Sequence, residues 1–268
     1  MTELITMHTH STFCNHAKDP LDDMVQAAVD AGIAHMAATE HYPIPDELDP
    51  SKRSTMPAER LEAYIDAVRE QQKRDDIDVL LGCELDWLGK DETRALHASD
   101  FDRFDVVLGS VHFVDRWLMV SHKNMSRWKS VDLEAFWNRY VELWCEAAKS
   151  DMPFTVMAHA DVVKKFSPKP EFDLEPLYER MARAAREGGR MVEVNTSGAY
   201  VECAEYYPSP SLLQAFRAEG VACTVGTDAH CKEHIARDIE RAYDYMRAAG
   251  YTQLAVPTRG RGVRMVDL

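Results

Sequence analysis

Residues 4–10 read LITMHTH, a short apolar segment that ends in two histidines. The pattern recurs along the chain, and the residues at or just after the ends of such apolar runs are His41, Glu84, His112, His159, Asp228 and His230. Continuous apolar runs are typical of parallel strands that are buried on both faces. The sequence therefore predicts buried strands whose ends carry imidazole and carboxylate groups, which are ligands of zinc, manganese and iron.

Apolar runs alternate with segments of helical periodicity. Strands are expected at 4–9, 34–40, 78–84, 105–112, 153–158, 190–195 and 221–227, and helices from the N-cap Asp19 to Gly32, after Pro57, and near 91–101, 131–149, 174–187, 209–219 and 238–249. This alternation implies parallel pairing with right-handed crossovers. We expect one α/β domain over residues 1–268, a barrel of the triosephosphate-isomerase (TIM) type with seven strands. Such barrels carry their chemistry at the C-terminal ends of the strands.

Composition narrows the classes of partner. The chain has 31 Lys and Arg against 45 Asp and Glu, a net charge of −14, which argues against long nucleic acids and anionic membranes. No run approaches the roughly 18 apolar residues of a membrane span, and no secretory signal is visible at the N-terminus. The six cysteines form no CxxC pair, which favours a reducing compartment. We therefore expect a cytoplasmic protein.

The positions of the candidate ligands in the sequence are evidence that they form one site. His8 and His10 are two residues apart, so that on a strand both side chains point to one face. Glu84 and Asp228 end apolar segments, where an unpaired carboxylate would be costly to bury. His16, six residues after His10, joins the set. The other four histidines are interpreted as packing or surface residues: His35, His97, His122 and His234.

Six motifs resemble those of the polymerase and histidinol phosphatase (PHP) family, and most closely its histidinol-phosphate phosphatase branch. They are MHTHSTFCNH (7–16), EH (40–41), GCE (82–84), GSVHF (109–113), HAD (159–161) and GTDAH (226–230), and the resemblance covers about residues 1–250. It implies a distorted seven-stranded (β/α)7 barrel that holds three divalent metal ions. The implied ligands are His8, His10, Glu84 and Asp228 for the first ion, Glu84, His112 and His159 for the second, and His16, His41 and His230 for the third.

The resemblance also implies a reaction. Seven neutral imidazoles and two carboxylates bring a charge of −2 to three divalent ions of total charge +6, so the site would attract a small anionic phosphoester. Hydrolysis would use a hydroxide that bridges the first two ions, with Glu84 as the bridging ligand. Asp161 is the candidate that passes a proton to the leaving group, and the alternative is that it orients a ligand or caps a helix. Zinc, manganese and iron all suit these ligands.

The chain departs from the family pattern at one position. A basic residue that grips phosphate is expected soon after the turn at 195–198, but residues 199–201 are Ala, Tyr and Val. Arg116 and Lys164 follow strand ends and are the candidates to replace it, while Tyr200 is a candidate to pack on a substrate ring or sugar. A histidinol-phosphate phosphatase of histidine biosynthesis is therefore the most specific prediction. A phosphodiesterase or cyclic-phosphate hydrolase of the same family is the alternative.

Three other classes of protein agree less well with the sequence. Amidohydrolases also begin with an HxH motif, but they usually bridge their metals with a modified lysine, and no strand end here offers a lysine. A non-catalytic metal-binding module is expected to have lost ligands, and none is lost. An exonuclease acting on DNA would fit the polymerase-associated branch, but the acidic composition and the lack of a polymerase body argue against it.

Overall fold

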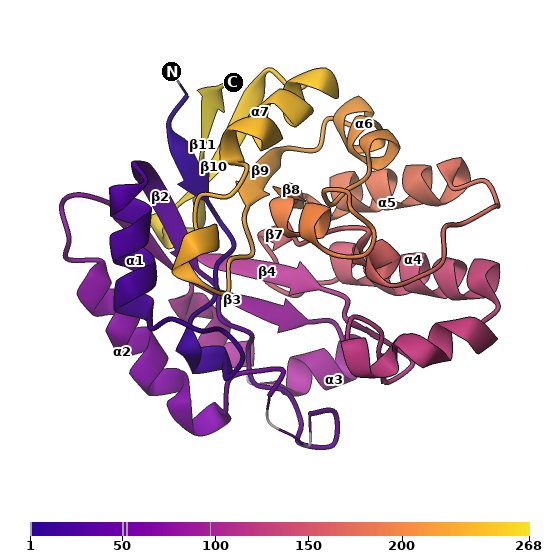
Figure 1. Cartoon of the computed structure of the whole chain (residues 1–268), viewed down its shortest axis with the longest axis horizontal. Coiled ribbons are helices and arrows are strands. Elements are labelled where there is room, and N and C mark those ends of the chain that lie inside the picture. The colour runs from indigo at the N-terminus through magenta and orange to yellow at the C-terminus, as the bar shows by residue number, and fades with distance from the viewer. Residues whose placement is uncertain (1, 50, 52, 97) are drawn as a thin grey trace.

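The computed structural model describes residues 2–49, 51, 53–96 and 98–268, so His97 lies outside the described residues. Seven parallel strands form one sheet in the order β1-β2-β3-β4-β7-β8-β9 (Figure 1). Their bounds are Leu4–Thr6, Ile33–Ala38, Asp78–Asp86, Val106–Ser110, Val156–Met157, Met191–Asn195 and Cys223–Gly226. All seven predicted strands are confirmed, and most of their residues are buried because the helices cover the outer face of the sheet.

Seven helices follow the strands, as the periodicity predicted. They are α1 (Leu21–Asp30), α2 (Leu61–Gln71), α3 (Lys90–Ala95), α4 (Leu133–Lys149), α5 (Glu175–Gly188), α6 (Pro210–Ala218) and α7 (Ile239–Ala248). Gly32 ends the first unit with a φ of 74°, a conformation that favours glycine. The predicted N-cap of α1 is wrong. Pro20 holds that position, and the Asp19 carboxylate accepts a hydrogen bond from the Lys232 backbone N–H instead.

The two edges of the sheet meet and nearly close a barrel. The Met7 N–H donates to the Val225 carbonyl at 2.8 Å, and the Asp228 N–H donates to the His8 carbonyl at 2.8 Å. An isolated parallel bridge between Thr9 and Ala229 extends this contact. The first and last barrel strands are therefore neighbours, and the residues that follow them share one end of the barrel. The described residues include no helix long and apolar enough to cross a membrane.

A C-terminal hairpin, β10 (Gln253–Thr258) and β11 (Gly262–Asp267), was not predicted from the sequence. Its arginines reach the N-terminal ends of the barrel strands: Arg259 pairs with Asp78 at 2.9 Å, and Arg264 pairs with Glu3. His35 lies in the same polar group, 3.1 Å from Glu3, which agrees with its interpretation as a structural residue. The hairpin therefore stabilises the end of the barrel opposite the candidate ligands.

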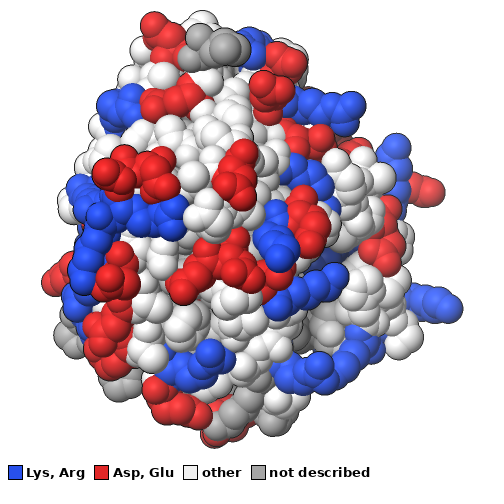
Figure 2. Space-filling view, turned by 60° about the vertical axis from the view of Figure 1, so that its left-hand side comes forward, with Lys and Arg blue, Asp and Glu red and all other residues white. Residues whose placement is uncertain are grey.

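A second hairpin follows β4. Strands β5 (Phe113–Val114) and β6 (Trp117–Leu118) are joined by Asp115 and Arg116, both with left-handed backbone (φ 47° and 63°). Such a two-residue turn matches the twist of the flanking strands. Arg116 therefore lies at an exposed hairpin tip. Figure 2 shows basic and acidic side chains interspersed over the face in view, without one dominant sign on that face.

Candidate metal centre

The C-terminal ends of the strands bring four ligands of the first predicted group together. His8 and His10 follow β1, Glu84 lies on β3, and Asp228 follows β9. The His10 Nε2 lies 3.4 Å from Glu84 Oε2 and 3.3 Å from Asp228 Oδ1. The His8 Nε2 lies 3.4 Å from the same Glu84 oxygen and 3.6 Å from Asp228 Oδ1. Four ligand atoms from three strands therefore converge on one point.

The second predicted group uses the other oxygen of Glu84. The Oε1 atom lies 2.9 Å from His159 Nε2 and 3.4 Å from His112 Nε2. The Ser110 hydroxyl donates to Oε1 at 2.5 Å and fixes its direction. Glu84 is 2 % exposed, and its two oxygens face two different histidine groups. This is the geometry required of a bridging carboxylate.

The third predicted group lies nearer the surface. The His16 and His230 Nε2 atoms are 2.9 Å apart, and a nitrogen of His41 lies within 4.8 Å of both. His41 also directs its Nδ1 at Glu84 Oε2, at 2.9 Å, so this imidazole lies between the first and third groups. The His10 ring stacks against the His41 ring and against the His230 ring, with the centroids 4.3 Å apart in each pair. The three groups therefore form one continuous cluster.

Two candidate ligands have strained backbones. His159 has a φ of 23° and Asp228 a φ of 50°, values that residues other than glycine rarely adopt. Strain of this kind costs about 1–3 kcal/mol and persists where the surrounding structure enforces it. At Asp228 the enforcing contact is the backbone hydrogen bond to His8. The strained backbone aims both side chains into the cluster.

The carboxylates of the cluster are held ionised. Burial raises the pKa of Glu84, but the nearby His41, His8 and His112 and the hydrogen bond from His159 outweigh it and hold that pKa well below its usual range. Burial likewise raises the pKa of Asp228, and His8 and the other imidazoles around it bring it well below its usual value. Ionised carboxylates are the form that binds metal.

Most of the imidazoles in the cluster whose pKa is shifted are held in the neutral form. Burial, reinforced by His41 and His230, lowers the pKa of His10 well below its usual range and that of His16 to about 3. His8 differs: burial lowers its pKa, but Glu193, Asp228 and Glu84 outweigh burial and raise it. The carboxylates around His8 therefore favour a positive charge at this position, which a proton or a metal ion can supply.

The donor set fits divalent ions. Three pairs of imidazoles direct Nε2 atoms at one another, at 3.1, 3.2 and 2.9 Å: His8 with His10, His112 with His159, and His16 with His230. Nitrogen ligands about 2.0–2.1 Å from a tetrahedral zinc ion lie about 3.3–3.4 Å apart. The buried Glu84 Oε2 accepts no hydrogen bond of good geometry from the described residues, although three imidazole nitrogens lie 2.9–3.4 Å from it. A cation in each group would bind the facing nitrogens of its pair, and one beside Glu84 Oε2 would also bind that oxygen.

Two carboxylates that orient ligands were missed in the sequence. Glu193, in the middle of β8, is fully buried and accepts hydrogen bonds from His8 Nδ1, the His159 N–H and Asn195 Nδ2, each at 2.9 Å. Asp86 lies 3.0 Å from His112 Nδ1. Bonds of this kind fix which ring nitrogen is free for metal. Glu193 stands in the apolar run MVEVN (191–195), so the argument applied to Glu84 could have found it.

The structure places Asp161 outside the histidine groups. Its Oδ2 accepts the Ser209 N–H at 2.8 Å and lies 3.0 Å from Lys164 Nζ. The Lys164 ammonium also contacts Glu205 at 3.2 Å and donates to the Tyr206 carbonyl at 2.8 Å. Lys164 lines a cavity of about 1240 Å³ beside α5 and α6, and none of the candidate metal ligands lies on its walls. These contacts support a positioning role for Asp161 over the transfer of a proton to the leaving group.

The other two substrate-binding candidates also have partners. Arg116 is exposed and lies 3.4 Å from Glu92. Tyr200 lies on the loop after β8, half-exposed, and its hydroxyl donates to Asp238 at 2.7 Å. The Arg237 guanidinium carbon lies 3.8 Å from the centroid of the Tyr200 ring. Arg237 was overlooked in the sequence because it follows the last metal motif by seven residues.

Comparison with known proteins identifies the family of the chain. The family model described as "PHP domain" matches residues 6–197, and the protein belongs to this family. A protein of Deinococcus radiodurans named "Probable histidinol-phosphatase" is 32% identical over 233 residues, which cover 86% of this chain and 87% of that protein. A protein of the same name from Schizosaccharomyces pombe is 24% identical, over 96% of this chain and 90% of its own.

A solved structure supports the fold. The histidinol phosphate phosphatase of Lactococcus lactis, complexed with zinc, L-histidinol and phosphate, superposes with a TM-score of 0.79 at 19% identity, covering 98% of this chain and 99% of that one. At this identity the likeness establishes the architecture alone. The predicted seven-stranded barrel is therefore confirmed by the strand order and by this neighbour.

Proposed function

We propose that the protein is a metal-dependent phosphatase that hydrolyses histidinol phosphate. The observation that carries the proposal is Glu84, a buried carboxylate whose two oxygens face two separate groups of histidines. The names of the relatives and the zinc, L-histidinol and phosphate of the Lactococcus lactis enzyme support the substrate and the metal class. The three groups of ligands support three ions per chain, of the zinc, manganese or iron class.

The ions would polarise phosphoryl oxygens and lower the pKa of water to about 7, which yields a nucleophile at neutral pH. The residues of the chain fix where this happens. Glu193 accepts from His8 Nδ1, so that the Nε2 lone pair faces the first group. The Ser197 hydroxyl, 3.2 Å from Asp228 Oδ2, restrains the second carboxylate of that group. The buried cluster thereby presents its ligands in one orientation at the C-terminal mouth of the barrel.

The proposal is tested by measuring phosphate release from histidinol phosphate, other phosphomonoesters, and linear and cyclic phosphodiesters. The protein is loaded with Zn²⁺ or Mn²⁺, and the Glu84→Gln variant, purified in parallel, controls for contaminating phosphatases. Histidinol phosphate is expected to be the best substrate. Brisk cleavage of a diester with weak release from histidinol phosphate would instead identify a phosphodiesterase. That outcome would explain the lack of a basic residue at 199–201, because a diester carries one negative charge fewer than a monoester dianion.

We further propose that Arg237 supplies the cation that the loop after Gly198 lacks. The Thr196 hydroxyl donates to the Arg237 carbonyl at 2.9 Å, and the next residue, Ser197, contacts Asp228. The Arg237 backbone is thus tied to the loop that borders the metal centre. Its Nε is buried and has no hydrogen-bond partner among the described residues, and its guanidinium stacks on Tyr200. Arg237 therefore retains a donor for an anionic group, whereas Lys164 is held by three oxygens.

The Arg237→Ala variant is expected to lower kcat/KM for histidinol phosphate by roughly tenfold to a hundredfold, because a charge-assisted contact contributes roughly 1.5–3 kcal/mol. Arg116→Ala, which removes an exposed arginine at a hairpin tip, is the matched control and should leave kcat/KM within about twofold, as is usual for surface changes of about 0.5 kcal/mol or less. Bound metal should be unchanged in both variants. Equal effects of the two substitutions would contradict the assignment.

A further inference from the structure

Glu40 is a buried carboxylate that the function proposed above does not use. It follows β2 and directly precedes His41, and it is 1% exposed. Its Oε1 atom accepts a hydrogen bond from the Ser11 backbone N–H at 2.6 Å and another from the Ser11 hydroxyl. A buried carboxylate is costly unless it is paired or hydrogen-bonded, and here both bonds go to one residue. Glu40 therefore joins the segment after β1 to the segment after β2.

The main chain of Glu40 is itself held by the sheet. The Glu84 N–H donates to the Glu40 carbonyl at 2.9 Å, and the Tyr42 N–H donates to the Glu84 carbonyl at 2.8 Å. These bonds form an isolated parallel bridge between His41 and Glu84. Because Glu84 lies on β3, the Glu40 side chain extends from a firmly held position and can fix the segment to which it is bonded.

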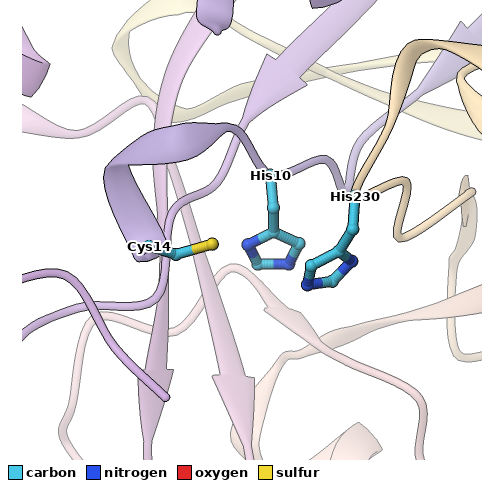
Figure 3. A group of neighbouring side chains, drawn as sticks. All are labelled: His10, Cys14 and His230. Atoms are coloured by element: carbon cyan, nitrogen blue, oxygen red, sulfur yellow. The ribbon is translucent and has the colours of Figure 1, made fainter. Parts of the chain in front are cut away.

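The segment bonded to Glu40 is a tight turn beside the histidine cluster. The Cys14 backbone N–H donates to the Ser11 carbonyl at 3.2 Å, so that Ser11 begins the turn. Figure 3 shows the turn running from His10 to Cys14, with Cys14 beside the His10 ring and His230 on the other side of that ring. A shift of Ser11 would therefore move the turn relative to the cluster.

The turn orients a ligand of the third group. The His16 Nδ1 lies 3.0 Å from the Cys14 carbonyl oxygen, which can only accept a hydrogen bond, so Nδ1 carries a proton. The Nε2 atom is then the ring nitrogen that can bind metal, and it lies 2.9 Å from His230 Nε2. Hydrogen bonds therefore lead from Glu40, through the turn, to the ring of His16.

We propose that Glu40 is a positioning residue for the third metal ion. It holds the turn in the place where the ring of His16 faces the rings of His41 and His230. The inference rests on the proposed metal centre and adds a requirement for its outermost ion. A carboxylate and a neutral carboxyl group both offer an acceptor oxygen, so this role depends on the hydrogen bonds and not on the charge of Glu40.

The first group of ligands has supports of its own. The Thr9 N–H donates to the Thr39 hydroxyl at 3.0 Å, and the Thr39 N–H donates to the Thr9 carbonyl at 2.9 Å. The His10 N–H donates to the Ala229 carbonyl at 2.9 Å. These bonds hold the two histidines after β1 without the Glu40 side chain, so its removal should affect the third ion selectively.

The test is a calorimetric titration of the metal-free protein with Zn²⁺. The unmodified protein is expected to bind three ions per chain. Glu40→Ala should bind two ions with unchanged affinity and the third roughly tenfold to a hundredfold more weakly, as is typical when a group that orients a metal ligand is lost. Glu40→Gln should bind all three as the unmodified protein does, because its carbonyl oxygen can accept both hydrogen bonds from Ser11.

Asp105→Ala is the matched control. Asp105 lies directly before β4, at the end of the barrel opposite the candidate ligands, and accepts the Leu81 N–H at 3.0 Å and the Gly260 N–H at 2.8 Å. Its loss should lower the urea midpoint and leave the binding of all three ions unchanged. The same result in Glu40→Ala would show a purely structural role and overturn the inference.

Hydrogen exchange in the metal-free protein gives a readout that does not depend on bound ions. The Ser11 amide should exchange roughly tenfold faster in Glu40→Ala than in Glu40→Gln or the unmodified protein. Equal exchange in all three would overturn the role of Glu40, as would the loss of all three ions together or an equal loss in both Glu40 variants. Fewer than three ions in the unmodified protein would contradict the proposed metal centre, and the exchange rates would still decide whether Glu40 holds the turn.

Discussion

The Glu84→Gln variant is expected to lose activity by roughly 10²–10⁴-fold, because it removes two charge-assisted contacts of roughly 1.5–3 kcal/mol each. Glu84 Oε2 faces the first group of ligands and Oε1 faces the second. A glutamine keeps the shape of the side chain but has no negative charge and directs an NH₂ group at one histidine cluster. Bound metal should fall along with turnover, and elemental analysis of the purified variant measures it.

The comparison that identifies a bridging ligand is with single histidine variants. His112→Asn removes a ligand of one group only, so its loss of activity should be smaller than that of Glu84→Gln. Glu92→Gln, which changes an exposed glutamate on α3, controls for the loss of a charge elsewhere. Near-normal turnover and metal content in Glu84→Gln would show that the two groups do not share this residue.

The second large effect is expected for Glu193→Gln. Glu193 Oε1 accepts hydrogen bonds from His8 Nδ1, the His159 backbone and Asn195, and Oε2 also lies 3.2 Å from His8 Nδ1. A glutamine is neutral and places an NH₂ donor at one of these two positions, in both cases against the His8 nitrogen. Loss of a group that orients a metal ligand typically costs 10–100-fold in metal affinity. One donor left without its charged acceptor should also lower the free energy of unfolding by roughly 1.5–3 kcal/mol.

Competition with a chromophoric chelator measures the metal affinity of Glu193→Gln, and the urea midpoint of the metal-free protein measures its stability. Glu187→Gln, on the outer face of α5, is the control, and neither quantity should change in it. Unaltered zinc affinity in Glu193→Gln would mean that the His8 ring is oriented by other contacts. Gly226 argues against that outcome, since a Cβ at this position would collide with both Glu193 and His8.

The strands, and the convergence of the candidate metal ligands at one end of the barrel, were predictable because both depend on local pattern. A continuous apolar run of five or six residues predicts a strand that is covered on both faces. A histidine or carboxylate at the C-terminal end of such a strand lies at the mouth of the barrel. Glu193 carried the same signal and was missed because it lies inside its strand and does not end it. The N-cap at Asp19 was wrong because a tertiary contact with Lys232 uses the carboxylate.

The residues proposed to bind substrate could not be predicted from local pattern. In the sequence, Lys164 could equally be a free surface cation. In the structure, the segment that contains Glu205 and Tyr206 folds back over its ammonium group. Arg237 and Tyr200 are 37 positions apart, and only the folded loops after β8 and β9 stack them. Side chains on long loops depend on contacts that have no period in the sequence.

The closure of the barrel by its first and last strands dictates an order in which a growing polypeptide can gain its metals. Only the second group, which uses Glu84, His112 and His159, is complete in a nascent chain of about 160 residues. The first group is incomplete until Asp228 has been synthesised, and the third until His230 has been synthesised. Each of these residues comes more than 210 positions after the histidine that it contacts, His10 or His16. We expect fragments that end before residue 228 to bind at most one ion. Binding of the full number of metal ions would then show that synthesis has passed the last barrel strand.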